Sequence, residues 1–157
     1  MTGPRLVLVF AGPLAQELGA LADRLGWPIT LVDPDRGRLD ADPVPYARCV
    51  LEVAEALLDE TCDVVVCDHD RAELGQVLRD VLDSRARWTG VVGSPRVVGP
   101  HVAALQALGV PADDIARVHR PIGLDIGSRT PPEIAVSTAA GLIADHHGRS
   151  GGFLTAG

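Results

Sequence analysis

The stretch RLVLVF at residues 5–10, with the turn and helix that follow it, decides the fold of this 157-residue chain. A continuous apolar run bounded by Gly12-Pro13 is typical of a strand buried on both faces. Leucines then recur at helical spacing over residues 14–25, and PITLVD at 28–33 has the pattern of a second buried strand. This order of strand, helix and strand predicts a right-handed crossover between parallel neighbours in one sheet.

The same alternation continues along the rest of the chain. We expect strands at 63–67, 88–92 and 117–119, helices at 46–58, 72–82, 101–108 and 131–146, and a loop at 34–45. The last helix has a good capping box, Thr130 with Glu133 around Pro131. The predicted fold class is α/β, Rossmann-like, with a mostly parallel sheet and helices on both faces. We expect one Rossmann-like domain over residues 1–147 and a flexible Gly/Ser-rich tail over 148–157.

The charge composition excludes several functions. All 14 basic residues are arginine, and with 21 acidic residues they give a net charge of −7. Without lysine the chain has no P-loop ending in Gly-Lys-Ser/Thr, no Schiff-base chemistry and no Tyr-x-x-x-Lys dehydrogenase site. The acidic balance also argues against a partner made of nucleic acid.

The cysteines and the N-terminal residues bear on the compartment. Three cysteines without Cys-x-x-Cys spacing fit a reducing compartment. Residues 1–22 also resemble a short signal peptide, but Gly12-Pro13 interrupts the apolar run, so we favour the cytoplasm. No stretch of about 18 uninterrupted apolar residues exists, and a membrane span is therefore not expected.

The residues just after each strand are the candidate ligand contacts, because parallel sheets bind ligands at the carboxyl ends of their strands. Gly12 and Ala15 match two positions of the fingerprint G-x-G-x-x-G/A, although Phe10 stands where the first glycine belongs. Asp33, 21 residues after Gly12, lies where an acidic residue would accept hydrogen bonds from a ribose. The alternative is that Asp33 only ends a strand and starts a turn.

Two further strand ends carry polar groups. The segment CDHD at 67–70 offers His69 and Asp70 as metal ligands or acid–base groups. Consecutive side chains point in different directions, so a helix cap with one functional histidine is favoured over a metal site. Cys67 itself is either a reactive thiol or an ordinary buried cysteine. After the next strand, Gly93, Ser94 and Arg96 form either an anion-binding turn or an ordinary turn.

The segment from 119 to 131 is the most unusual in the chain. It contains a connection with glycines at 123 and 127 and few positions suited to a core. Such a loop normally brings its backbone close to another group. The candidate contacts in it are Pro121, Ile122, Gly123, Asp125 and Gly127.

The same segment carries a family resemblance. PIGLDIGSRTPPEIAVS at 121–137 closely resembles the P-I-G-L-x-I-G-A-x-T-P-x-E-I-A-x-S signature of the XdhC/CoxI family. Other family motifs have counterparts in the same order: VFAG at 9–12, LVDP at 31–34, VVVCDHD at 64–70, WTGVVGS at 88–94 and LGVP at 108–111. The resemblance is to the C-terminal Rossmann domain of that family.

The resemblance implies an accessory role rather than substrate turnover. Members of the family serve as maturation factors that bind the molybdenum cofactor and hand it to apoenzymes such as xanthine dehydrogenase and carbon monoxide dehydrogenase. It therefore implies a molybdopterin-type cofactor or dinucleotide in the pocket, a molybdenum hydroxylase apoenzyme as partner, and no catalytic residue or metal ligand among the site residues.

The departures from the family pattern leave other functions open. The sequence has no counterpart of the family's N-terminal domain, and Arg71 replaces the second histidine of its T-H-D-H motif. We expect a stand-alone copy, served by a separate N-terminal-type XdhC partner if that domain is needed. The alternatives are an oxidoreductase-like protein that binds NAD(P), and a non-catalytic interaction module. The latter would form a homodimer through the small-residue face Ala135, Ala139, Ala140 and Gly141 of the last helix.

Overall fold

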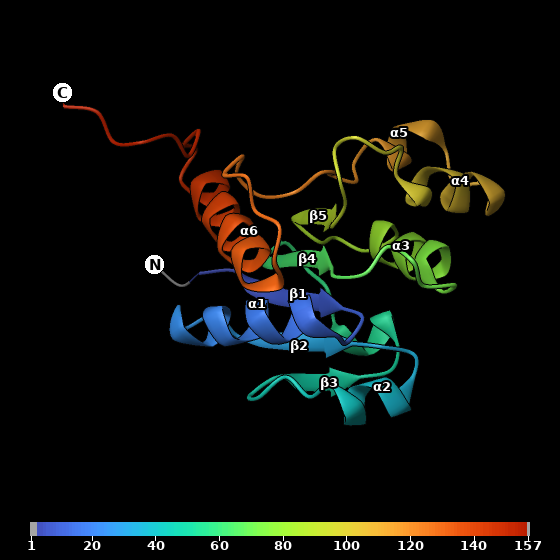
Figure 1. Ribbon diagram of the computed structural model, residues 1–157. Helices are drawn as coiled ribbons and strands as arrows, with labels where there is room; N and C mark the ends of the chain where they lie inside the picture. The colour runs from blue at the N-terminus through green and yellow to red at the C-terminus, as the bar shows by residue number, and fades with distance from the viewer. Residues whose placement is uncertain (1–2, 157) are drawn as a thin grey trace.

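The computed structural model describes residues 3–156 and contains one parallel sheet of five strands, in the order β3-β2-β1-β4-β5 (Figure 1). The strands are β1 (Arg5–Val9), β2 (Ile29–Val32), β3 (Arg48–Val50), β4 (Cys62–Val66) and β5 (Trp88–Val91). The helices are α1 (Pro13–Arg24), α2 (Arg36–Ala41), η1 (Val53–Ala56), α3 (Leu74–Leu82), α4 (Pro100–Ala107), α5 (Ala112–Ile115) and α6 (Pro131–His146). The order reverses between β1 and β4, so their carboxyl ends form the switch point of the sheet.

The alternation of side chains along the central strands divides the core into two layers. Leu6 and Leu8 of β1 face the layer that includes α1 and α6, whereas Val7 and Val9 face the layer that includes α3 and α4. Both sets are at most 1% exposed. A strand buried on both faces reads as a continuous apolar run, which explains the RLVLV sequence. The α/β Rossmann prediction is therefore confirmed.

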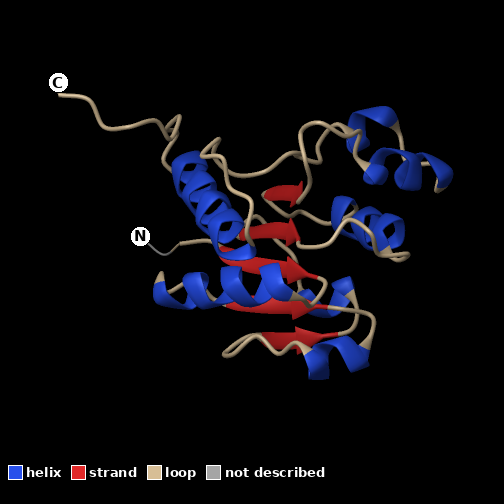
Figure 2. Cartoon of the chain, viewed as in Figure 1, coloured by secondary structure: helices blue, strands red, loops and turns tan. Residues whose placement is uncertain are grey.

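Helices α1 and α6 cover one face side by side (Figures 1 and 2). Ala135 and Ala139 of α6 are each 2% exposed and belong to the core shared with α1. Two of the four small residues predicted to join two copies of the chain are therefore not available to a second copy in this structure. The small side chains instead let α6 approach α1 and the loop before it within the same chain.

The residues between β2 and β4 differ most from the predictions. A helix was expected over 46–58, but residues 48–50 form β3, paired in parallel with β2, and only a short 3-10 helix follows. The free side of β2 offers main-chain hydrogen bonds to residues 48–50, and these outweigh a weak helical pattern. The expected loop 34–45 contains α2, which the Asp35 side chain caps by accepting from the Arg38 N–H.

Two smaller differences lie beyond β5. The strand expected at 117–119 is reduced to a single parallel bridge between Gly90 and His119, and α5 was not expected. The predicted capping box of α6 is confirmed: Thr130 accepts from the Glu133 N–H, and the Glu133 carboxylate accepts from the Thr130 N–H.

The described part of the tail has no helix or strand after α6, and Phe153 and Leu154 are fully exposed. Its flexibility stays a prediction. Met1, Thr2 and Gly157, which belong to the predicted domain and tail, lie outside the described residues. Among residues 3–156, none of the helices combines the length and apolar character that crossing a membrane requires.

Candidate functional site

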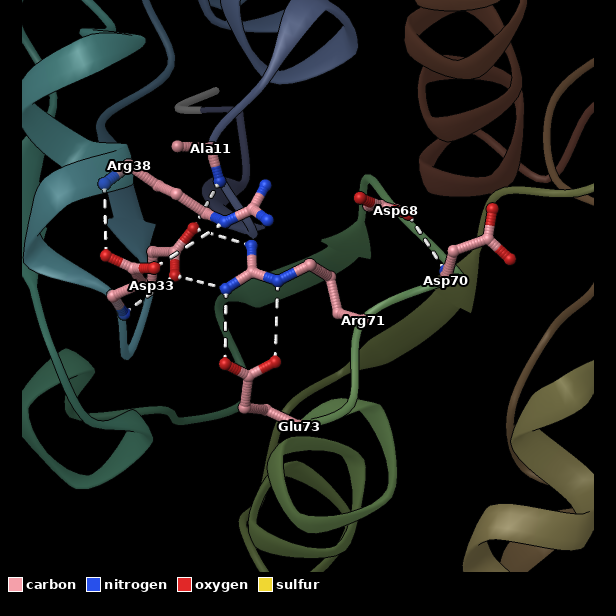
Figure 3. A network of polar contacts seen from close by, with 8 residues as sticks. Ala11, Asp33, Arg38, Asp68, Asp70, Arg71 and Glu73 are labelled. Carbon is pink, nitrogen blue, oxygen red and sulfur yellow. Dashed lines mark hydrogen bonds and ion pairs between the residues drawn. The ribbon is translucent and has the colours of Figure 1, made fainter.

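The carboxyl ends of β1 and β2 meet around Asp33, which is completely buried. Its oxygens accept four hydrogen bonds. The main-chain N–H groups of Ala11 and Asp35 each donate at 2.9 Å, and the Arg71 guanidinium donates twice, at 2.9 and 2.8 Å (Figure 3). A carboxylate offers about four acceptor positions, so every acceptor of Asp33 is used within the chain.

Arg71 is held on three sides. It lies between Asp33 and Glu73, whose carboxylate is 3.4 Å from the Arg71 Nε (Figure 3). Its guanidinium carbon also lies 4.4 Å from the centre of the buried Phe10 ring, a cation–π contact. Burial alone would raise the pKa of Asp33, but the hydrogen bonds from Arg71, Asp35 and Ala11 and the Arg71 charge outweigh it, so the pKa lies below its ordinary value.

This network fills the half of the site where a dinucleotide fingerprint would hold adenosine. Phe10 occupies the place of the first glycine with a φ of 74°, and its ring supports Arg71 from below. Gly12 precedes α1 and has open space where a side chain would start. Asp33 is thus brought next to the loop as predicted, but its carboxylate has no acceptor left for a ribose in this arrangement.

The residues after β4 point in different directions. His69 is partly exposed, and its Nε2 lies 3.6 Å from the Asp70 carboxylate. Burial raises the pKa of the Cys67 thiol to about 12, which favours the protonated form at neutral pH. Among residues 3–156, no three His, Cys, Asp or Glu side chains are grouped closely enough to hold a metal ion.

The turn after β5 is the more open half of this edge. Ser94 accepts from the Arg96 N–H through its hydroxyl, and both residues are exposed. Gly93 supports the guanidinium of Arg120, so closely that a Cβ at Gly93 would collide with it. Ser94 and Arg96 are therefore accessible, and the half-buried Gly93 lies against a further cation.

The glycine-spaced loop packs against α6 along part of its length. The Leu124 N–H donates to the Ser137 carbonyl at 3.1 Å, and the Ser137 hydroxyl donates to the Leu124 carbonyl at 2.6 Å. Gly123 has a φ of 87°, and a Cβ there would collide with the Ser137 hydroxyl. Close approach to α6 therefore explains Gly123. Asp125 and Gly127 remain exposed at the turn before α6, where their contact with a ligand stays a prediction.

An ion network that was not predicted from the sequence lies at the amino end of β4. Buried Asp63 accepts two hydrogen bonds from Arg87, at 2.8 and 3.0 Å, and lies 2.9 Å from the His146 ring. Arg87 also pairs with Asp145 at 2.6 Å. This network ties the end of α6 to β4 and has a structural role.

A cleft of about 840 Å³ lies away from the predicted residues, between η1 and α3. Its floor is apolar and its rim carries the acidic groups Glu52, Glu73, Asp80 and Asp83. No positive charge from an arginine lines it, so it is unsuited to a phosphate or another anion. The residues predicted as an anion-binding turn, Gly93, Ser94 and Arg96, lie after β5 instead.

Comparisons with known proteins agree with this arrangement. The XdhC Rossmann domain family matches residues 6–142. The chain is 30% identical over 156 residues to YqeB, an uncharacterised protein of Escherichia coli (strain K12). The aligned region covers 96% of this chain and 29% of YqeB. A Bacillus halodurans protein described as a xanthine dehydrogenase has the same fold, with a TM-score of 0.75, 23% identity, and coverage of 94% of this chain and 44% of that one. The chain thus spans less than half the length of either relative, and it belongs to the XdhC family as a Rossmann domain of that family.

Proposed function

We propose that this chain acts in the maturation of a molybdenum hydroxylase and holds an anionic, nucleotide-type cofactor at the carboxyl ends of β4 and β5. The observation that carries the proposal is the family match over residues 6–142, which includes every candidate ligand contact. The molybdenum hydroxylase apoenzyme is the proposed partner. A separate N-terminal-type XdhC chain is a second proposed partner.

The two halves of the edge differ in how well they suit a molybdopterin-type cofactor. That cofactor supplies the molybdenum centre of the client enzyme and carries phosphate. The half around Asp33 fits it poorly, because Arg71 and the Phe10 ring fill the space and use the acceptors of the carboxylate. The half after β5 fits better, since Gly93, without a side chain, makes room for the Arg120 guanidinium, and Arg96 is exposed on the same loop.

The alternative of an NAD(P)-binding oxidoreductase has less support. NAD recognition depends on a free carboxylate at the end of β2, and all four acceptor positions of Asp33 are used within the chain. The interaction-module alternative loses its proposed dimer face, because Ala135 and Ala139 are buried within the chain. We expect the protein to work in the cytoplasm, where its three free thiols stay reduced.

The test is co-purification from the native host. A tagged chain should retain a molybdenum hydroxylase subunit, and acid oxidation of the purified complex should release a fluorescent pterin. A control is the exposed Arg24→Gln variant, which removes one positive charge at the carboxyl end of α1 and should retain both the hydroxylase and the pterin. Recovery of neither the hydroxylase nor a pterin with the unaltered chain would refute the proposal.

A further inference from the structure

Arg120 is a cation without a counter-charge. Within residues 3–156, its only side-chain hydrogen bond runs from Nη1 to the Val97 carbonyl, at 2.7 Å. Its Nε is buried and has no partner, and among the residues that the structure describes its guanidinium pairs with no carboxylate. This is unusual in a chain with 21 acidic residues for 14 arginines. An unsatisfied buried donor on a charged group is destabilising unless a partner binds it.

Two glycines make room for this side chain. A Cβ on Gly93 would collide with the guanidinium of Arg120, and a Cβ on Gly99 would press against its Cδ. The arginine side chain therefore lies against the backbone at both ends of the loop from 93 to 99. Nη1 donates to the Val97 carbonyl, whereas Nε and Nη2, the pair that binds an oxyanion in bidentate fashion, face Gly93.

His101, in α4, borders Gly99 as well. It is only 6% exposed, and its Nδ1 is buried without a hydrogen-bond partner. The imidazole edge that carries Nδ1 faces Gly99, the residue before the first turn of α4, and no side chain caps this helix. Burial and the charge of Arg120 lower the pKa of His101, so the ring is held without a second positive charge beside the arginine.

An unsatisfied imidazole nitrogen and the uncapped amino end of an eight-residue helix thus meet at Gly99, and the Cδ of Arg120, whose guanidinium borders Gly93, lies against the same glycine. The helix end and the guanidinium both favour a negative charge. We propose that His101 and Arg120 form an oxyanion subsite that takes a phosphate group, with Arg120 as the bidentate donor and the Nδ1–H of His101 as a third donor. Val97 and Val98, both well exposed on the same loop, would face the body of a phosphate ester.

The subsite deepens the proposed function by naming the chemical class that the β5 half of the edge recognises, and it rests on that function for the identity of the complete ligand. His101 was not among the contacts predicted from the sequence. The test of the subsite nevertheless needs only the full chain and simple anions. The subsite and the proposed function can therefore be refuted independently of each other. Anion binding without a pterin or hydroxylase would refute the proposed function alone.

The experiment is a titration of the 157-residue chain, followed by amide NMR, with inorganic phosphate, ADP and adenosine as separate probes. Shifts should converge on Gly93, Gly99 and His101 for phosphate or ADP and not for adenosine. Arg120→Gln should weaken binding by about tenfold or more, and Arg120→Lys, which keeps the charge but loses the fork, should weaken it less. Arg24→Gln is the charge-matched control and should bind as the unaltered chain does.

The outcomes separate the sources of the phosphate. Binding of inorganic phosphate that is lost in Arg120→Gln assigns the subsite to a free oxyanion, whereas binding of ADP alone that is lost in the same variant assigns it to a phosphate ester. His101→Gln, a second variant, guards against a folding defect at one position and should also weaken binding. The proposal is overturned if neither anion shifts these amides, or if folded Arg120→Gln binds as tightly as the unaltered chain.

Discussion

The carboxylate of Asp33 and the guanidinium of Arg71, 38 residues apart in the sequence, form a bidentate ion pair with N–O distances of 2.8 and 2.9 Å. The pair is almost closed to solvent, since Asp33 is fully buried and Arg71 is 8% exposed. It joins the end of β2 to the loop after β4, across the end of β1 (Figure 3). The acidic position that binds ribose in dinucleotide-binding folds is used here for an ion pair that connects two segments of the protein.

Removing the arginine should therefore unfold the chain more easily. Arg71→Met leaves a buried carboxylate without its counter-charge, and we expect a loss of about 3–5 kcal/mol in the free energy of unfolding by urea. The double variant Asp33→Asn with Arg71→Met removes both charges and should be less destabilised than Arg71→Met alone. The control is Arg38→Met, which breaks an exposed pair with Asp35 at 3.7 Å and should cost about 0–1 kcal/mol. Equal losses for Arg71→Met and Arg38→Met would contradict the role of the buried pair.

The same pair predicts an acid dependence of stability. The pKa of Asp33 in the folded chain lies below its ordinary value of 3.8, so above that value the carboxylate is ionised in both states and its contribution is complete. As the pH falls below 3.8, the unfolded state takes up the proton first, and stability is lost until the pH passes through the folded pKa.

The measurement is the thermal midpoint of the unaltered chain and of Asp33→Asn across this acid range. The difference between the two should narrow as the pH falls, because the variant has no carboxylate to protonate. The other carboxylates titrate in both proteins and cancel in the comparison. A difference that stays constant down to the lowest pH would mean that the Asp33 charge contributes nothing.

The central fold could be predicted from the sequence because its strands are buried on both faces. A strand such as β1 is recognisable from five consecutive residues, and α6 from its cap, since both signals are local. β3 could not be found in this way. It has three residues, of which only Val50 is buried, and its pairing with β2 depends on a neighbour almost 20 residues earlier in the chain.

The location of the candidate site could be predicted from the sequence, but the ion pairing within it could not. The carboxyl ends of the strands follow from the fold, and Asp33 does lie at one of them. Which arginine would pair with it could not be read from a chain with 14 arginines and no lysine, because ion pairing between distant segments leaves no periodic signal. The replacement of a family histidine by Arg71 was the available clue, and it indicated only a departure from the pattern.

The two glycines of the loop before α6 offer a matched test of close packing. Gly123 and Gly127 have similar φ values, 87° and 73°, but a Cβ at Gly123 would collide with Ser137, whereas a Cβ at Gly127 meets nothing. Gly127→Ala should cost about 1–2 kcal/mol from backbone strain. Gly123→Ala should cost about 1–3 kcal/mol more, because the loop must also move away from α6. Urea unfolding of both variants measures the difference, and equal costs would show that the contact with Ser137 has no energetic weight.

The three thiols should differ sharply in reactivity. Cys49 is exposed on β3, Cys62 is buried in β4, and burial holds the pKa of Cys67 at about 12. Because the thiolate is the reactive form, a folded chain at neutral pH should lose one thiol equivalent quickly to a chromogenic disulfide reagent, and the other two only after unfolding. Cys49→Ser should abolish the fast phase and Cys67→Ser should leave it unchanged. Fast labelling of Cys67 in the folded chain, identified by peptide mass, would mean that the end of β4 opens to solvent and that its thiol is available for chemistry.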